Sequence, residues 1–321
     1  MQKIIKQGAC MCHVERLDED HCISGVNFMA TDFDAYVDIV FDVHNYEITD
    51  ANWAIHRCPD MDRRGQGKAT MIIGDSAFPA DGRLSVRIMP DYSKCTDFTM
   101  PPGGWFDYPH HKDKLEEVCP DDDKARAKAE KDNVSPEWKK VRELFLEAVR
   151  GAFQGELFLV EERGFDSLAD LQEKWLEDKN AYCRPYNPPD LELARTWPPF
   201  IGLSQHYPLK NTYKKYIQYV LYDEGDGVVR SVSHYNDSTH TMSAEIRYVA
   251  ETGEIIGVEN SIQRVPFDIC AECEGRNVEW FTGKNIYALS KRDVGGAIGG
   301  PKGCFHMLDV IWYAIESIQG I

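Results

Sequence analysis

The alternation of apolar and polar residues predicts two β-hairpins that are far apart in the chain. The first is FDAYVDIVFDVHNYEITDANWAIHRCP, residues 33–59, and the second is HTMSAEIRYVAETGEIIGVENSIQRVP, residues 240–266. In each segment, a run with strand periodicity is followed by a polar turn and by a second strand-like run that ends at a proline. The turn of the second segment, ETGE, contains the glycine that tight hairpins favour.

The two hairpin segments align without a gap. The identical pairs are Ile39 and Ile246, Glu47 and Glu254, Ile48 and Ile255, Ile55 and Ile262, Arg57 and Arg264, and Pro59 and Pro266. The sequence before each hairpin also has the pattern of a strand, at 21–31 and at 228–238. We interpret this similarity as an internal repeat. The alternative is a chance likeness between two ordinary hairpins.

A helix is predicted after each hairpin. Residues 135–153 begin with Ser135 as a suitable N-cap and Pro136 at the first helical position. The last helix is predicted over 304–319. Its apolar face is formed by Leu308, Ile311, Trp312, Ile315 and Ile318. The expected fold class is therefore α+β, with two related units, each an antiparallel β-meander packed on a C-terminal helix.

The chain is expected to divide into two units and a connector. The first unit spans residues 1–154 and carries a long insertion at about 60–134. Residues 155–205 contain a predicted helix and a proline-rich connector, in which the prolines prevent regular structure. The second unit spans residues 206–321. A length of 321 residues is enough for two domains of ordinary size.

Composition argues against several classes of protein. A formal net charge of −17 repels nucleic acid and anionic membrane surfaces. No segment has the roughly 18 consecutive apolar residues of a membrane span, and the first residues lack the apolar core of a secretion signal. We expect a cytoplasmic protein that acts on a small molecule. The sequence does not decide whether it forms a homo-oligomer. In that compartment the ten cysteines are thiols or metal ligands rather than disulfides.

Four motifs follow one another in the second half of the chain. They are HTM at 240–242, VPFDIC at 265–270, FTGKNI at 281–286 and GCFHML at 303–308. With these motifs, residues 228–321 resemble a bacterial family known as a domain of unknown function, and residues 21–59 resemble it weakly. Phe305 and Met307 depart from the family pattern, and the first half lacks the Gly-Cys-x-His motif. The resemblance implies a fold and a site at the start of the last helix, but no particular reaction.

The segment GGPKGCFH, residues 299–306, is a candidate binding and catalytic segment. A glycine-rich loop that runs into a helix offers backbone N–H groups and the positive end of the helix dipole. Gly300, Lys302 and Gly303 are therefore candidates for binding a substrate carboxylate or phosphate. The same field lowers the pKa of a thiol, which makes Cys304 a candidate thiolate. The alternatives are a flexible turn and a buried structural cysteine.

Histidines provide the candidate acid and base. His240 and Tyr235 lie in the polar segment SHYNDSTH at the end of a predicted strand. His306 lies off the apolar stripe of the last helix, beside Asp309, so we expect its pKa to stay in the neutral range. We predict that His306 transfers protons with help from His240 or Tyr235. The alternative is an ordinary polar turn.

A metal site is the competing interpretation of the same region. Cys270 and Cys273 form a C-x2-C pair, and Cys304 and His306 complete a set of three thiolates and one imidazole. Such a set suits zinc, and the order of the elements also allows iron. The C-x-H spacing of the second pair is not usual for a zinc knuckle.

Three functions follow from these candidates. The first is a small-molecule enzyme, for which we favour a lyase that acts by proton transfer on an aromatic or carboxylated compound. Its catalytic residues would be His306, Cys304, His240 and Tyr235. Its pocket wall would be Trp105, Phe106 and Tyr108. The second is a zinc or iron–sulfur carrier, and the third is a non-catalytic ligand-binding module. No nucleotide-binding motif points to hydride or phosphoryl transfer.

Overall fold

The computed structural model describes residues 3–58, 64–69, 72–74, 76–77, 136–167, 169–171, 173–174, 184–186, 211–300 and 302–319. These residues belong to two units. The N-terminal unit lies within Cys12–Pro79 and Leu84–Gln154, and the C-terminal unit lies within Met1–Met11, Ala80–Arg83 and Gly155–Ile321. Strand β1 (Lys3–Arg16) contributes residues to both units.

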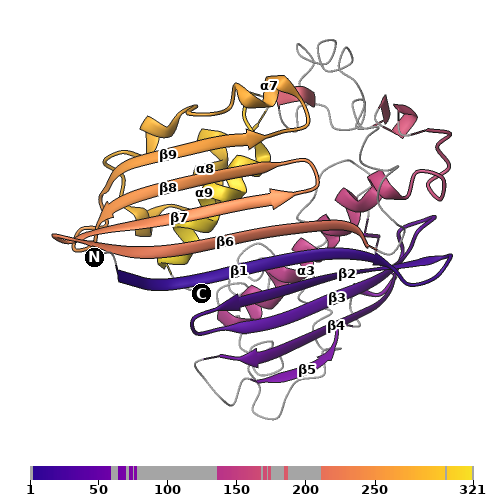
Figure 1. Cartoon of the computed structure of the whole chain (residues 1–321). Coiled ribbons are helices and arrows are strands. Elements are labelled where there is room, and N and C mark those ends of the chain that lie inside the picture. Colours follow the sequence, from indigo (N-terminus) through magenta and orange to yellow (C-terminus); the bar gives the residue numbers. More distant parts are fainter. Residues whose placement is uncertain are drawn as a thin grey trace, which may run out of the picture. The chain divides into compact units, whose positions relative to one another are not determined.

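The N-terminal unit is built on an antiparallel meander. Its strands pair in chain order and are β2 (His21–Ala30), β3 (Asp34–Asp42), β4 (Ile48–Arg57) and the short β5 (Gly65–Lys68). Alternate residues of β3 such as Val37, Ile39 and Phe41 are fully buried, as expected for a sheet with one face on a core. Helix α3 (Pro136–Gln154) packs on β2 and β3 (Figure 1).

The C-terminal unit contains a second antiparallel meander. Its long strands also pair in chain order and are β6 (Asn211–Gly225), β7 (Val228–Asp237), β8 (Thr241–Val249) and β9 (Ile255–Arg264). Helix α9 (Phe305–Gln319) packs on β6, β7 and β8, and helix α8 (Lys291–Ile298) packs on α9 (Figure 1).

Short helical segments complete this unit. They are η5 (Gly155–Phe158), η6 (Arg184–Tyr186), α7 (Asp268–Ala271), η7 (Val278–Phe281) and η8 (Ile286–Ala288). None of the helices in the described ranges is long and apolar enough to cross a bilayer.

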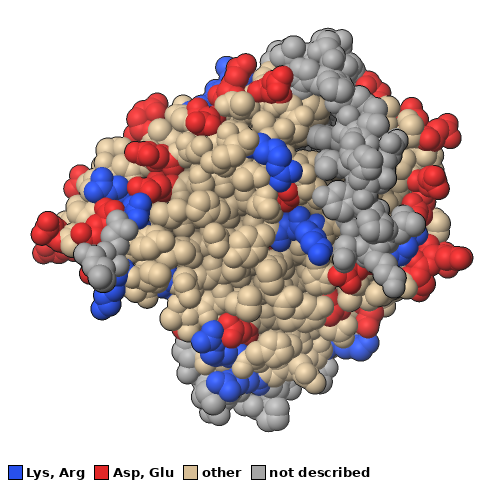
Figure 2. All heavy atoms as spheres, in the orientation of Figure 1, with Lys and Arg blue, Asp and Glu red and all other residues tan. Residues whose placement is uncertain are grey.

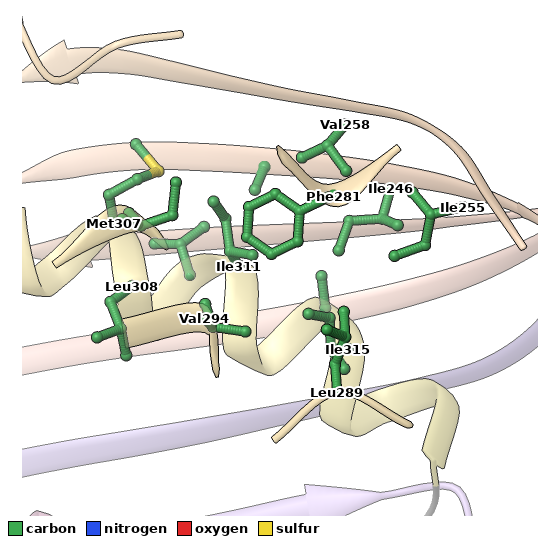
Figure 3. Packing of buried hydrophobic residues seen from close by; sticks show 14 of the residues in the cluster. Ile246, Ile255, Val258, Phe281, Leu289, Val294, Met307, Leu308, Ile311 and Ile315 are labelled. Atoms are coloured by element: carbon green, nitrogen blue, oxygen red, sulfur yellow. The ribbon is translucent and has the colours of Figure 1, made fainter. Parts of the chain in front are cut away.

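The core of the C-terminal unit lies between α9 and the inner face of the sheet. Met307, Ile311 and Ile315, which lie one turn apart on α9, are fully buried against residues such as Ile246 and Phe281 (Figure 3). Burying one such side chain stabilises the fold by about 1.5–3 kcal/mol. This apolar stripe fixes which face of α9 is turned toward the sheet.

Two buried serines join the sheet to α9 by hydrogen bonds. The Ser231 hydroxyl donates to the carbonyl of Ala314 at 2.9 Å, and the Ser233 hydroxyl donates to the carbonyl of Val310 at 2.7 Å. Apolar packing alone has little directionality, whereas hydrogen bonds to particular carbonyls set the position of the helix along its axis. The start of α9 therefore has a defined place at the end of β7.

The predicted α+β class is confirmed, and both predicted hairpins are present as β3–β4 and β8–β9. The predicted last helix starts one residue later than expected, at Phe305, because the Cys304 N–H bonds to the Ile298 carbonyl outside the helix. Trp105, Phe106 and Tyr108 lie outside the described residues, as does most of the insertion at 60–134.

Charged side chains lie mostly toward the edges of the face shown in Figure 2, around a broad central area without them. In Figure 2, Asp and Glu side chains appear in many places, and Lys and Arg side chains form separate small groups on the described part of this face. The larger number of acidic side chains agrees with the formal net charge of −17.

The loop before α9 provides a test of the packing. A Cβ on Gly303 would lie 1.9 Å from the Ile298 carbonyl oxygen and 2.5 Å from the Gly299 carbonyl oxygen. Because both obstacles are backbone atoms, Gly303→Ala should lower the free energy of unfolding by about 2–3 kcal/mol in denaturant titrations. Gly296→Ala is the matched control. That position is helical with open space around it, so alanine should add about 0.5–1 kcal/mol. Equal stabilities of the two variants would contradict this account of the loop.

Candidate active site

Three side chains with proton-transferring chemistry meet where β7 ends and α9 begins. Asp237 is the last residue of β7, His240 immediately precedes β8, and His306 lies in the first turn of α9. One ligand-type atom from each residue lies within 4.8 Å of the others. Asp237 and His240 are buried, and His306 is partly exposed. The structure therefore brings the predicted pair His240 and His306 together and adds a carboxylate.

The tight turn between β7 and β8 places Asp237 beside His240. The Asp237 N–H donates to the His240 carbonyl at 3.0 Å, and the Asp237 carboxylate accepts the N–H groups of Thr239 at 2.7 Å and of His240 at 2.6 Å. An aspartate that accepts backbone N–H groups two and three residues on is a common way to fix a turn. The turn thus aims the carboxylate and the imidazole at each other.

Further donors saturate the carboxylate. The Tyr235 hydroxyl donates to Asp237 Oδ2 at 2.8 Å and the Tyr213 hydroxyl at 3.3 Å, while His240 Nδ1 lies 3.1 Å from both oxygens. Burial alone would raise the pKa of Asp237, but His240 and the hydrogen bonds hold that pKa well below its usual range. Asp237 is therefore an ionised carboxylate at neutral pH.

The ionised carboxylate selects one tautomer of His240. Because a carboxylate only accepts hydrogen bonds, Nδ1 of His240 carries the proton that points to Asp237. The Thr239 hydroxyl oxygen, 2.8 Å from the same nitrogen, supports this orientation. In the neutral form of this ring, Nε2 is then the atom with a lone pair. The same arrangement prepares the general base in hydrolases with a Ser-His-Asp triad.

The ring of His306 stacks on the ring of His240. Their centroids are 3.8 Å apart with 32° between the planes, and the Tyr235 ring lies 5.3 Å from His306. Burial lowers the pKa of His306 well below its ordinary value, and the neighbouring His240 lowers it further, against the opposing effect of Asp237. The expected neutral-range pKa is therefore wrong, because desolvation of the imidazole outweighs the nearby carboxylates. His306 is a neutral imidazole at pH 7.

Lysines and a second aspartate complete the charges around the pair. Lys215, buried on β6, is the cross-strand partner of Asp237, and its charge also lowers the pKa of His306. Asp309, buried on α9, lies 3.2 Å from the Lys291 ammonium. The segment SHYNDSTH already placed Asp237 beside His240 as a neighbouring carboxylate, whereas no sequence pattern picks out Lys215 or Tyr213 as site residues. The inward position of a lysine within the alternating segment TYKKYIQYV would have been the available signal.

Cys304 caps α9. Its Sγ accepts the Met307 N–H at 3.4 Å, and its own N–H donates to the Ile298 carbonyl at 3.0 Å. Burial raises the pKa of the Cys304 thiol to about 12. The expectation of a thiolate is therefore wrong, because desolvation exceeds the effect of the helix dipole.

The glycine loop uses its own backbone donors. The Gly303 N–H donates to the Gly300 carbonyl at 2.9 Å, so neither this group nor the Cys304 N–H points to an incoming anion. Gly300 has a φ of 77°, which favours glycine, and Lys302 is exposed. Two backbone donors near the predicted anion site of Gly300, Lys302 and Gly303, the N–H groups of Gly303 and Cys304, are thus already used within the chain.

The cysteines do not gather around His306. Cys270 and Cys273 are buried, and burial raises the pKa of both thiols. Asp237, His240 and His306 form the one group found in the described ranges whose ligand-type atoms all lie within 4.8 Å. The predicted set of Cys270, Cys273, Cys304 and His306 is not such a group. Cys304 lies outside α9 as its cap, whereas His306 lies in the first turn of the helix.

The Asp–His–His group has the donor types that first-row metals accept. Its present hydrogen bonds favour a proton relay instead. Both oxygens of Asp237 already accept hydrogen bonds, and His240 directs Nδ1 to that carboxylate. The two imidazole rings lie close together, with their centroids 3.8 Å apart and their planes tilted by 32°.

The C-terminal unit is thus an α+β domain with a buried carboxylate and two stacked imidazoles. Residues 218–318 of it match the model of a family described as a protein of unknown function, DUF2889. This match supports a domain of unknown function in the second half of the chain. No curated protein and no solved structure was found to match.

Cys304 can be tested as a cap. Cys304→Ser keeps an acceptor for the Met307 N–H and places a favoured N-cap residue there, so the melting temperature should stay within a few degrees. Cys304→Ala removes the acceptor and should lower the free energy of unfolding by about 1 kcal/mol. Thermal melts and denaturant titrations of the two variants measure these two effects. Equal losses for serine and alanine would point to packing of the sulfur rather than capping.

The lowered pKa of His306 predicts a dependence of stability on pH. The groups that face this imidazole are His240, Asp237, Tyr235, Lys215 and Asp309. Below about pH 6.5, the pKa of a histidine in the unfolded chain, His306 is protonated in the unfolded chain but stays neutral in the folded protein. The free energy of unfolding should therefore fall as the pH falls from 7 to 5.

The comparison variant is His306→Gln, which does not titrate. Its melting temperature should fall less than that of the wild type between pH 7 and pH 5. The carboxylate of Asp237 affects the free energy of unfolding outside this pH window. Its pKa is lowered in the folded protein, so its stabilising effect is lost only below about pH 3.9, the pKa of an aspartate in the unfolded chain. Identical shifts in wild type and variant would contradict a buried neutral imidazole.

Proposed function

We propose that the chain is a small-molecule enzyme, with a lyase-type reaction on an aromatic or carboxylated compound, and that the C-terminal unit transfers the protons. The observation that carries this proposal is the contact of Asp237, His240 and His306, in which the carboxylate orients one imidazole and the second imidazole stacks on the first. His306 is partly exposed, so a ligand has access to the imidazole pair.

The residues divide into reacting and positioning groups. His240 Nε2 removes a proton from a carbon of the substrate, and the electron pair of that C–H bond forms a double bond as the leaving group departs. The leaving group takes a proton from His306 after that ring has collected one from solvent, and His240 returns its proton to solvent. Asp237 keeps His240 in the required tautomer. Tyr235, whose pKa is raised well above the ordinary value by burial, stays protonated and holds Asp237.

Lys215 supports a carboxylated substrate. It is buried on the inner side of β6, its register partner is Asp237, and its charge acts on His306. A positive charge at this place favours an anionic group on the ligand and stabilises negative charge that develops when a proton is removed next to a carboxylate.

The two alternatives have less support. A zinc or iron carrier would need Cys270, Cys273, Cys304 and His306 to converge, and their ligand-type atoms do not lie within 4.8 Å of one another. A non-catalytic ligand-binding module would use the same polar residues without turnover. Metal analysis of protein purified without chelator and without air tests the first alternative, and turnover tests the second.

The proposal predicts a loss of proton exchange in His306→Gln. A panel of small carboxylic acids and phenols is incubated with the protein in D2O, and exchange of carbon-bound hydrogen is followed by NMR. Substitution of a true acid or base should lower the rate for an active compound by about 10²–10⁴.

His234→Gln is the matched control for this experiment. His234 lies on β7 as well, but it is exposed on the other face of the strand, so its variant should exchange like the wild type. If His306→Gln retains the wild-type rate, the catalytic assignment is wrong. Binding of panel compounds with no exchange or turnover would support the ligand-binding module instead.

We also propose that the two units are copies of one ancestral unit. Support comes from strand bounds that correspond at a constant offset of 207 residues, as from Asp34 to Thr241, for β2 and β7, β3 and β8, and β4 and β9. The irregularities of pairing correspond too. They fall at Asp34/Ala35 and Val40/Phe41 in one hairpin and at Thr241/Met242 and Arg247/Tyr248 in the other.

Corresponding side chains make corresponding hydrogen bonds. Arg57 donates to the carbonyls of Ala30 and Thr31, and Arg264 donates to those of Asp237 and Ser238.

The serine contacts between sheet and helix correspond as well. Ser24 Oγ donates to the Ala148 carbonyl of α3 at 2.6 Å, and Ser231 Oγ donates to the Ala314 carbonyl of α9 at 2.9 Å. Two unrelated hairpins would not be expected to share strand bounds, pairing irregularities, an arginine clamp and a serine contact to the following helix.

A further inference from the structure

The N-terminal unit has different residues at each position that corresponds to the candidate active site. At the strand offset, Tyr235, Asp237 and His240 correspond to Phe28, Ala30 and Phe33. The frame around these positions is kept, since the Ala30 N–H donates to the Phe33 carbonyl at 2.8 Å as the Asp237 N–H donates to the His240 carbonyl at 3.0 Å.

The ring positions are also kept. Phe28 and Phe33 have ring centroids 6.1 Å apart, and Tyr235 and His240 have ring centroids 6.2 Å apart. The N-terminal unit therefore has two phenyl rings where the C-terminal unit has a phenol and an imidazole.

The helices correspond through the serine contacts at an offset of 166 residues, as from Ala148 to Ala314. This offset pairs Lys140 of α3 with His306 of α9. The spatial positions agree, because the Lys140 ammonium lies 4.7 Å from the Phe28 ring and the His306 ring lies 5.3 Å from the Tyr235 ring. The same offset pairs Glu143, which bonds to Lys140 at 3.2 Å, with Asp309.

We infer that the place in the N-terminal unit that corresponds to the candidate active site is a catalytically silent copy, and that the proton transfer proposed for Asp237, His240 and His306 has no counterpart at that place. This inference rests on the proposed function and on the proposed repeat. At the corresponding place the N-terminal unit has two buried phenyl rings, a methyl group and an ammonium. None of these four groups accepts a proton at neutral pH, and the carboxylate of Glu143, which corresponds to Asp309, is paired with Lys140.

Physical reasons favour this change in a copy that has lost its chemistry. A buried carboxylate and imidazole need many donors to offset their desolvation, and well-packed apolar side chains need none. Phe28 and Phe33 are 2% and 0% exposed, so they add apolar burial at the place where the C-terminal unit buries polar groups. The N-terminal unit thus has the same frame, with buried phenyl rings where the C-terminal unit has polar rings.

The first test gives the C-terminal unit the residues of the N-terminal unit. The variant Y235F/D237A/H240F/H306K should fold, because the same residue types occupy the same frame in the N-terminal unit and Asp309 can pair with the new lysine as Glu143 pairs with Lys140. Its exchange rate in D2O should fall to background. Its NMR spectrum should lose the downfield signal of the Nδ1 proton that His240 shares with Asp237. A folded variant that keeps at least a tenth of the wild-type rate would overturn the inference.

The second test restores the N-terminal unit. The graft F28Y/A30D/F33H/K140H in the full chain should produce a second downfield Nδ1 proton signal, since the frame that aligns Asp237 with His240 is present there. A folded graft without this signal would overturn the correspondence. Lys140→Met is the control for a hidden role of the N-terminal unit, and it should leave the exchange rate within twofold of the wild type.

The two tests separate this inference from the proposed function. If the wild-type chain exchanges no compound of the panel, the proposed function fails, and the Nδ1 signals still decide whether the N-terminal unit can hold the same pair. If the graft does not fold, the reciprocal variant decides alone. A rate that survives in that variant and is abolished by Lys140→Met would place the chemistry in the N-terminal unit.

Discussion

The buried carboxylate of Asp237 is the group on which the arrangement of the site depends. Removing an ionised carboxylate from water costs several kcal/mol unless donors replace the lost hydration. Here the replacements come from the turn, as the N–H groups of Thr239 and His240, and from two strands, as the hydroxyls of Tyr235 and Tyr213. These donors are satisfied only when the end of β7, the turn and the start of β6 are all in place. The interaction that stabilises the charge is therefore also the one that orients His240.

The second imidazole is positioned by the fold rather than by Asp237. His306 reaches His240 because α9 is held on the sheet by the buried face of Met307, Ile311 and Ile315 and by the serine hydroxyls of β7. The helix starts immediately before His306, so its ring belongs to the first turn and lies over the end of β7. A shift of one turn along the axis would remove the contact. The proposed proton transfer at this site therefore depends on the packing of α9 as well as on the acid–base properties of the side chains.

Local patterns predicted the hairpins, the last helix and the meeting of His306 with His240 and Tyr235, because strand and helix periodicity act over short ranges of sequence. The contributions of Lys215 and Tyr213 could not be read in this way, since they depend on pairing between β6 and β7. The thiolate expected at Cys304 failed for a related reason. A helix start indicates a favourable field, but burial depends on the surrounding tertiary structure and raises the pKa of this thiol to about 12. The C-x2-C pair likewise has the residue types of a metal site, but its ligand atoms do not converge with those of Cys304 and His306 within 4.8 Å.

If the two units are copies of one ancestral unit, as proposed above, their comparison indicates which residues are needed for folding and which are not. The serine contacts and the arginine clamp occur in both units, so they belong to the frame. The Asp–His–His group occurs in one unit, and phenyl rings with a lysine fill the same frame in the other. A fold that accepts apolar residues at these positions does not require the polar ones for its stability. Under the proposed function, the buried carboxylate of Asp237 and the imidazole stacked on His240 act on a ligand, and the fold does not depend on them.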